Sequence, residues 1–90
     1  MSYFAVHLKM KDESLSKEYR PAHLAFLEEQ HREKNVAAYG KFADGSGGLI
    51  IYRGESLKQV EALVKQDPYV ESGARTYDIR EWMMNSEDWE

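Results

Sequence analysis

Large apolar residues occupy every second position between 4 and 10, and this alternation constrains the fold more than any other stretch. Successive side chains of a strand point to opposite faces of a sheet, so a period of two predicts a strand. One face is strongly apolar and the other is mixed. The apolar set is Phe4, Val6, Leu8 and Met10, and the mixed set is Tyr3, Ala5, His7 and Lys9. Such a strand has to bury its apolar face against a second layer.

A helical period of apolar residues follows Pro21. Proline has no backbone N–H and suits the first helical position, so Arg20 is the predicted N-cap and His23 falls in the first turn. The charged segment 11–16 is predicted to be a loop. The helix is expected to end near 34–35, where an asparagine suits the left-handed exit.

The rest of the chain repeats the pattern of strand and helix. Ser56 and Gln59 form a capping box that starts a second helix, and Asp67-Pro68 ends it because a residue before proline is disfavoured in the α region. The predicted strands are residues 36–42, 49–53 and 76–83, the first two joined by a glycine-rich turn at 44–48. The order βαββαβ predicts an α+β, ferredoxin-like fold with a four-stranded antiparallel sheet.

The length favours one small domain, residues 1–84, followed by an acidic tail, residues 85–90, that is expected to be mobile apart from Trp89. Two helices cover only one face of such a sheet. The mixed face is therefore predicted to stack on a second protomer, which gives a homodimer with a cavity between the two sheets.

Composition excludes several classes of function. A net charge of −4 without a basic run argues against nucleic-acid or anionic-membrane binding, and the absence of cysteine excludes disulfides and thiolate catalysis. No apolar run approaches the roughly 20 residues that span a bilayer. The N-terminus begins directly as a strand and has no basic leader, so the chain is expected to be cytoplasmic.

The candidate chemistry lies in two segments, 20–23 and 67–69. A helix N-terminus disfavours imidazolium, so His23 is expected to be neutral and to act as a general base. Asp67 would orient the ring, and Arg20 would bind an anionic substrate group. The alternatives remain open: His23 could simply pack, Asp67 could cap a local turn, and Arg20 could form a structural ion pair.

Further candidates are weaker. Tyr69 and His7 are expected to line the substrate cavity, although tyrosines and interface histidines commonly have structural roles. No metal site is predicted, because His23 and His31 are two helical turns apart, about 12 Å along the axis. No motif supports a cofactor of any kind.

Several segments and the hairpin turn at 44–48 occur together in a characteristic order and spacing. The segments are Arg20-Pro21-Ala22-His23-Leu24, Ala38-x-Gly40-x-Phe42, Asp67-Pro68-Tyr69-Val70 with Gly73, and Arg80-Glu81-Trp82. Over residues 3–83 this pattern resembles the YciI-like (YCII) family. The resemblance implies the dimeric α+β barrel fold and a His–Asp site at His23 and Asp67. Most members have no established activity, and one relative removes hydrogen chloride from a chlorinated hydroxyhydroquinone. Lys41 departs from the family, where many members have proline.

Two functions compete. The first is a cofactor-independent lyase or isomerase that moves a proton on a small, aromatic or enol-lactone substrate. The second is a non-catalytic module that binds a small molecule or a protein. An oxygenase with this fold is a third possibility. The separation of His23 and Asp67 in space distinguishes the first two.

Overall fold

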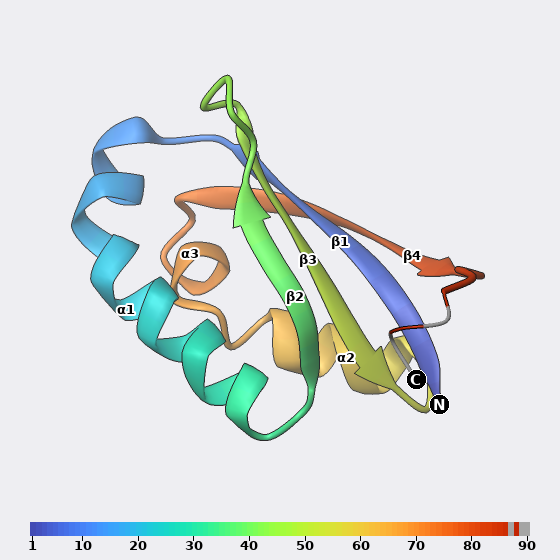
Figure 1. Cartoon of the computed structure of the whole chain (residues 1–90). Helices are drawn as coiled ribbons and strands as arrows, with labels where there is room; N and C mark the ends of the chain where they lie inside the picture. Colours follow the sequence, from blue (N-terminus) through green and yellow to red (C-terminus); the bar gives the residue numbers. More distant parts are fainter. Residues whose placement is uncertain (87, 89–90) are drawn as a thin grey trace.

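The computed structural model describes residues 1–86 and 88 (Figure 1). Its elements are β1 (Ser2–Met10), α1 (Glu13–Arg32), β2 (Val36–Lys41), β3 (Gly47–Gly54), α2 (Leu57–Val64), α3 (Pro68–Glu71) and β4 (Arg75–Trp82). The strands form one antiparallel sheet in the order β2-β3-β1-β4. The predicted α+β, βαββαβ fold is confirmed. Of the predicted tail, residues 87, 89 and 90, and therefore Trp89, lie outside the described residues.

The helices cover one face of the sheet, and the alternation in β1 decides which face. Phe4, Val6 and Leu8 are at most 2% exposed and pack in a core with residues of α1, α2 and α3. Their neighbours in β1 point to the uncovered face. The register with β4 adds a second row to that face, which comprises Thr76, Asp78, Arg80 and Trp82. Within the described residues, no helix is long and apolar enough to cross a membrane.

The first helix begins earlier than predicted, and this corrects three expectations. Asp12 is the N-cap, and its carboxylate accepts the Leu15 N–H at 2.9 Å. Residues 13–16 of the segment predicted as a loop form the first part of α1, so Arg20 is not a cap and His23 is not in a first turn. Pro21 is inside the helix. It is exposed, so water can solvate the carbonyl that loses its helical partner.

Of the other predicted helix ends, the start of α2 is confirmed and the two C-terminal ends differ from the prediction. The Ser56 hydroxyl accepts the Gln59 N–H at 3.2 Å, as the capping box predicts. The left-handed exit of α1 is at Lys34, with φ 69°, rather than at the asparagine that follows it. α2 ends at Val64 with Lys65 as its C-cap, earlier than the predicted stop at Asp67-Pro68. Asp67 is instead the N-cap of α3, with Pro68 directly after it.

The β2–β3 hairpin brings backbone close to backbone. At Gly47, a Cβ atom would lie 2.3 Å from the carbonyl oxygen of Leu8 in the neighbouring strand, and φ is 153°. Only glycine fits this approach. The hairpin therefore presents little side-chain volume to the space between the sheet and α1, which matters for the site.

Candidate active site

A histidine and an aspartate far apart in sequence meet beneath the sheet. His23 Nδ1 lies 2.8 Å from Asp67 Oδ1. The His23 side chain is 10% exposed and that of Asp67 is 1% exposed. With Asp67 ionised, Nδ1–H donates to the carboxylate, and this fixes the tautomer in which Nε2 can accept a proton. The structure brings together the two residues that the sequence analysis paired.

Asp67 is fixed by the start of α3. Its Oδ1 also accepts the Tyr69 N–H at 2.9 Å, as the side chain of an N-cap does. α3 packs against α1, which carries His23. The Asp-Pro turn is therefore both a structural cap and the anchor of the imidazole, so the two alternatives for Asp67 are compatible.

A stack of planar groups extends from the imidazole. The rings of His23 and Tyr69 lie 3.8 Å apart between centroids, at an interplanar angle of 13°. The Arg75 guanidinium carbon lies 4.5 Å from the centroid of the Tyr69 ring. Because the imidazole covers one face of the tyrosine, the guanidinium covers the other. The stack fixes the orientation of the imidazole in addition to the bond to Asp67.

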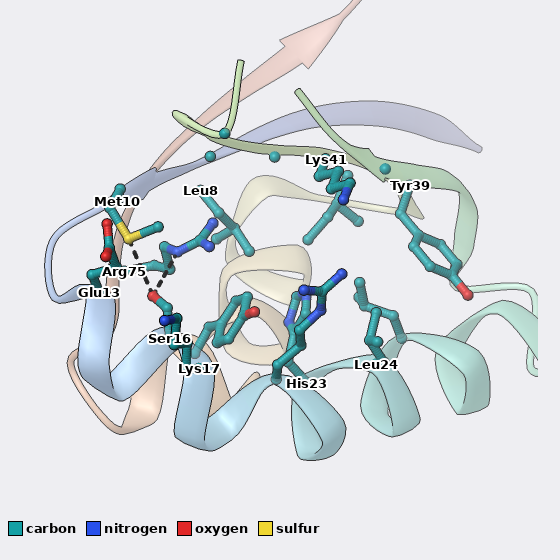
Figure 2. A pocket seen from close by; sticks show the side chains of 18 residues that line it. Leu8, Met10, Glu13, Ser16, Lys17, His23, Leu24, Tyr39, Lys41 and Arg75 are labelled. Atoms are coloured by element: carbon teal, nitrogen blue, oxygen red, sulfur yellow. Dashed lines mark hydrogen bonds between the residues drawn. The ribbon is translucent and has the colours of Figure 1, made fainter. Parts of the chain in front are cut away.

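These groups border a cavity of about 490 Å³ between α1, the β2–β3 hairpin and α3. Figure 2 shows His23 between two ends of the cavity. Met10, Glu13, Ser16, Lys17 and Arg75 gather at one end, and Leu24, Tyr39 and Lys41 at the other. The glycines of the hairpin line part of the wall, which leaves room for a small molecule.

The cavity is cationic although the chain is acidic. Lys17, Arg20, Lys41 and Arg75 line it together with His23, against one carboxylate, that of Glu13. Among residues 1–86 and 88, none of the four cations forms an ion pair. Positive charge that is not neutralised by the protein favours an anionic ligand or an anionic intermediate.

A buried phenol lies behind the pair. Tyr52 is 0% exposed, and its hydroxyl and Asp67 Oδ2 both lack a hydrogen-bond partner among the described residues. Burial, and then the negative charge of Asp67, raise the pKa of the Tyr52 phenol well above its usual value. The phenol therefore stays protonated and does not compete with His23 as a base.

Four of the five predicted site residues lie together. His23, Arg20 and Tyr69 line the cavity, and Asp67 lies directly behind His23. His7 does not: it is on the uncovered face, where its ring packs edge-on against Phe42 at 5.4 Å. The cavity lies between sheet and helix, whereas His7 was expected to line a cavity between two sheets.

Sequence reasoning missed the end of the cavity near Arg75. Ser16 was assigned to a loop, and Arg75 precedes the segment predicted as the last strand. The N-cap Asp12 is the sequence signal that was overlooked. A helix that starts directly after Asp12 includes Ser16 and turns its side chain toward the core. No three His, Asp or Glu side chains of the described residues gather in a way that would bind a metal ion.

The model of the YCII-related domain family matches residues 1–83. The chain belongs to this family. It is similar to the uncharacterised protein YjpA of Bacillus subtilis strain 168, with 30% identity over 82 residues that cover 91% of this chain and 96% of YjpA.

The fold is similar to that of a solved enzyme. This is the 5-chloro-2-hydroxyhydroquinone dehydrochlorinase TftG from Burkholderia phenoliruptrix AC1100, in complex with 2,5-dihydroxybenzoquinone. The TM-score is 0.77 at 23% identity, over 92% of this chain and 95% of TftG. At this identity the likeness establishes the shared fold of the two chains.

Proposed function

We propose that this protein is a cofactor-independent lyase or isomerase in which His23 transfers a proton on a small aromatic or enolic substrate. The observation that carries the proposal is the buried hydrogen bond, 2.8 Å long, between His23 Nδ1 and Asp67 Oδ1 on the wall of a cationic cavity. The fold shared with a dehydrochlorinase supports it by analogy.

The chemistry follows from the tautomer. Nε2 of neutral His23 accepts a proton from a carbon next to a carbonyl or from a phenolic hydroxyl, and the electron pair moves toward the carbonyl oxygen or the ring. Asp67 stabilises the imidazolium that forms. The anion then either regains the proton at another atom, which is isomerisation, or expels a leaving group such as chloride, which is elimination of HX.

The cations stabilise the intermediate. Arg20 and Lys41 line the cavity together with His23, and both are exposed and without an ion pair within the described part of the chain. Negative charge that develops on the substrate oxygen would be nearer to them than to bulk counterions. Arg20, predicted as the anion-binding residue, keeps that role in the proposal, and Tyr69 acts as a stacking surface for the imidazole.

The test is a panel of halogenated hydroxyhydroquinones and enol-lactones, assayed for chloride release, absorbance change and deuterium uptake from heavy water. We expect His23→Gln and Asp67→Asn to lower kcat by about 100-fold or more, the usual contribution of a positioned base. His7→Gln is the matched control, since that histidine lies on the other face. Wild-type rates in both site variants, or neither chloride release nor deuterium uptake with the wild type, would refute the proposal and indicate a non-catalytic binding module.

We also propose that the protein forms a homodimer through the uncovered face of the sheet. That face includes Leu49 and Trp82, which are 37% and 43% exposed in the single chain. Exposure of these apolar side chains to water is unfavourable, and a second protomer would bury them. The face lies on the side of the sheet opposite the cavity, so a partner could cover it without closing the site.

A further inference from the structure

Arg75 is fixed in place at the end of the cavity away from Leu24 and Tyr39 (Figure 2). Its Nε donates to the Ser16 hydroxyl at 3.0 Å, and its guanidinium lies over the Tyr69 ring. Ser16 is 4% exposed and is itself close to Met10 Sδ, at 3.3 Å. An arginine restrained on two sides has already lost most of its rotamer freedom, so a ligand that binds it does not have to order it.

The two terminal nitrogens of this guanidinium are available. Within the part of the chain that the structure describes, the bond to Ser16 is the only side-chain hydrogen bond of Arg75, and the guanidinium forms no ion pair. The side chain is half-buried and lines the cavity. A planar guanidinium with unused N–H groups matches the geometry of a carboxylate, which it binds through two parallel hydrogen bonds.

The surrounding charges favour an anion, with one opposing group. Lys17 lies at the same end and adds a second cation, whereas Glu13 adds a carboxylate that does not pair with either within the described residues. Arg20 is a less suitable anchor because its side chain is exposed and forms no ion pair with any residue of 1–86 and 88, so it is free to move toward negative charge at the reacting centre.

We propose that Arg75, oriented by Ser16 and Tyr69 and assisted by Lys17, binds a carboxylate of the substrate. The substrate is then a small aromatic or enolic carboxylic acid, whose carboxylate lies at Arg75 while the proton that is removed lies at His23. The division of roles rests on the proposed function, but binding of a carboxylate at Arg75 does not require that His23 be catalytic.

The experiment compares two probes that share a dihydroxybenzene ring and differ at one substituent, which is charged in one and neutral in the other. Gentisate carries a carboxylate on a dihydroxybenzene ring, and gentisyl alcohol carries a neutral hydroxymethyl group at the same position. Binding of each to the full chain is measured by NMR titration of the backbone amides. We expect gentisate to bind the wild type about tenfold more tightly or better, the value of one charge-assisted contact.

Single substitutions test whether the preference for gentisate over gentisyl alcohol depends on Arg75. Arg75→Gln should bring the two affinities to within about twofold, and Ser16→Ala should reduce the preference partly, because it frees the guanidinium. Glu13→Gln should increase it by removing repulsion. Arg80→Gln is the matched control: it removes an arginine from the same strand, on the uncovered face, and should leave the preference unchanged. An unchanged amide spectrum shows in each case that the fold is retained.

The results separate this proposal from the proposed function. His23→Gln should keep the preference for gentisate even if it abolishes turnover. If the wild type does not distinguish the two probes, if gentisate causes no shifts at tens of millimolar concentration, or if Arg75→Gln retains the full preference, the carboxylate site is refuted. Loss of turnover without loss of the preference in His23→Gln would support both proposals.

Discussion

The two faces of the sheet each contain a short contact between a carboxylate and a basic group, and the surroundings of the two contacts differ. On the side of the sheet that the helices cover, His23 and Asp67 are 2.8 Å apart with side chains 10% and 1% exposed. On the uncovered face, Lys9 and Asp78 are 2.6 Å apart with side chains 48% and 47% exposed.

The exposure of each contact to water determines how much it contributes to stability. Water can replace either partner of an exposed pair, so such pairs contribute little to stability. A buried pair cannot be replaced in this way, and removal of one partner leaves the other unsatisfied. The same chemistry that stabilises a surface only weakly can therefore fix a tautomer and an orientation inside the molecule. The length of a contact alone does not identify a site.

The largest expected effect is the difference in stability between a variant that lacks Asp67 and one that lacks Asp78. Asp67→Ala leaves the His23 Nδ1–H and the Tyr69 N–H as buried unpaired donors, each at a cost of roughly 1–3 kcal/mol. Asp78→Ala removes a solvated carboxylate and should lower the unfolding midpoint much less than Asp67→Ala. Urea unfolding followed by circular dichroism measures both. Equal midpoints for the two variants would contradict the distinction between the faces.

An intermediate effect is expected at the proposed dimer interface. Leu49→Asp places a charge on the uncovered face and should weaken self-association by about tenfold or more. Leu57→Asp is the control, because Leu57 is 50% exposed on α2, away from that face. Light scattering coupled to size-exclusion chromatography measures both. A monomeric wild type, or equal dimerisation of the two variants, would reject the interface.

The smallest expected effect is a shift in the pKa of Asp78. The hydrogen bond from Lys9 and its positive charge hold the pKa of the Asp78 carboxyl below its ordinary value. A carboxyl with a lowered folded pKa stabilises the fold above its unfolded pKa, near 3.9, and loses that contribution as the pH falls through the folded pKa. NMR titration should show the lowered pKa, and Lys9→Met should return it toward the ordinary value. No change in Lys9→Met would exclude this cause.

Much of the fold could be predicted because its signals are local. The alternation in β1 fixes which side chains face the helices, and the Ser56 cap fixes the start of α2. Pro21 misled the prediction of α1. A proline is common at a first helical position, but an exposed interior position with solvated carbonyls also tolerates it.

The sequence analysis paired His23 with Asp67 from the residues and from the family resemblance, but its argument that a helix terminus keeps His23 neutral was wrong. His23 is in the interior of α1, so the helix terminus does not act on it, and its partner alone sets the tautomer. The contact between Ser16 and Arg75 could not be anticipated. It joins positions 59 apart in the chain, and such packing follows from tertiary structure rather than from any local pattern.

The stack of Arg75, Tyr69 and His23 gives the cavity an internal reporter. A tyrosine ring face to face with an imidazole shifts the resonances of the imidazole protons through its ring current, and the size of that shift depends on the tilt between the rings. A ligand that pulls the guanidinium from the far side of the ring would alter the tilt. Occupancy at one end of the cavity would thus be visible in the proton spectrum of a single histidine at its centre.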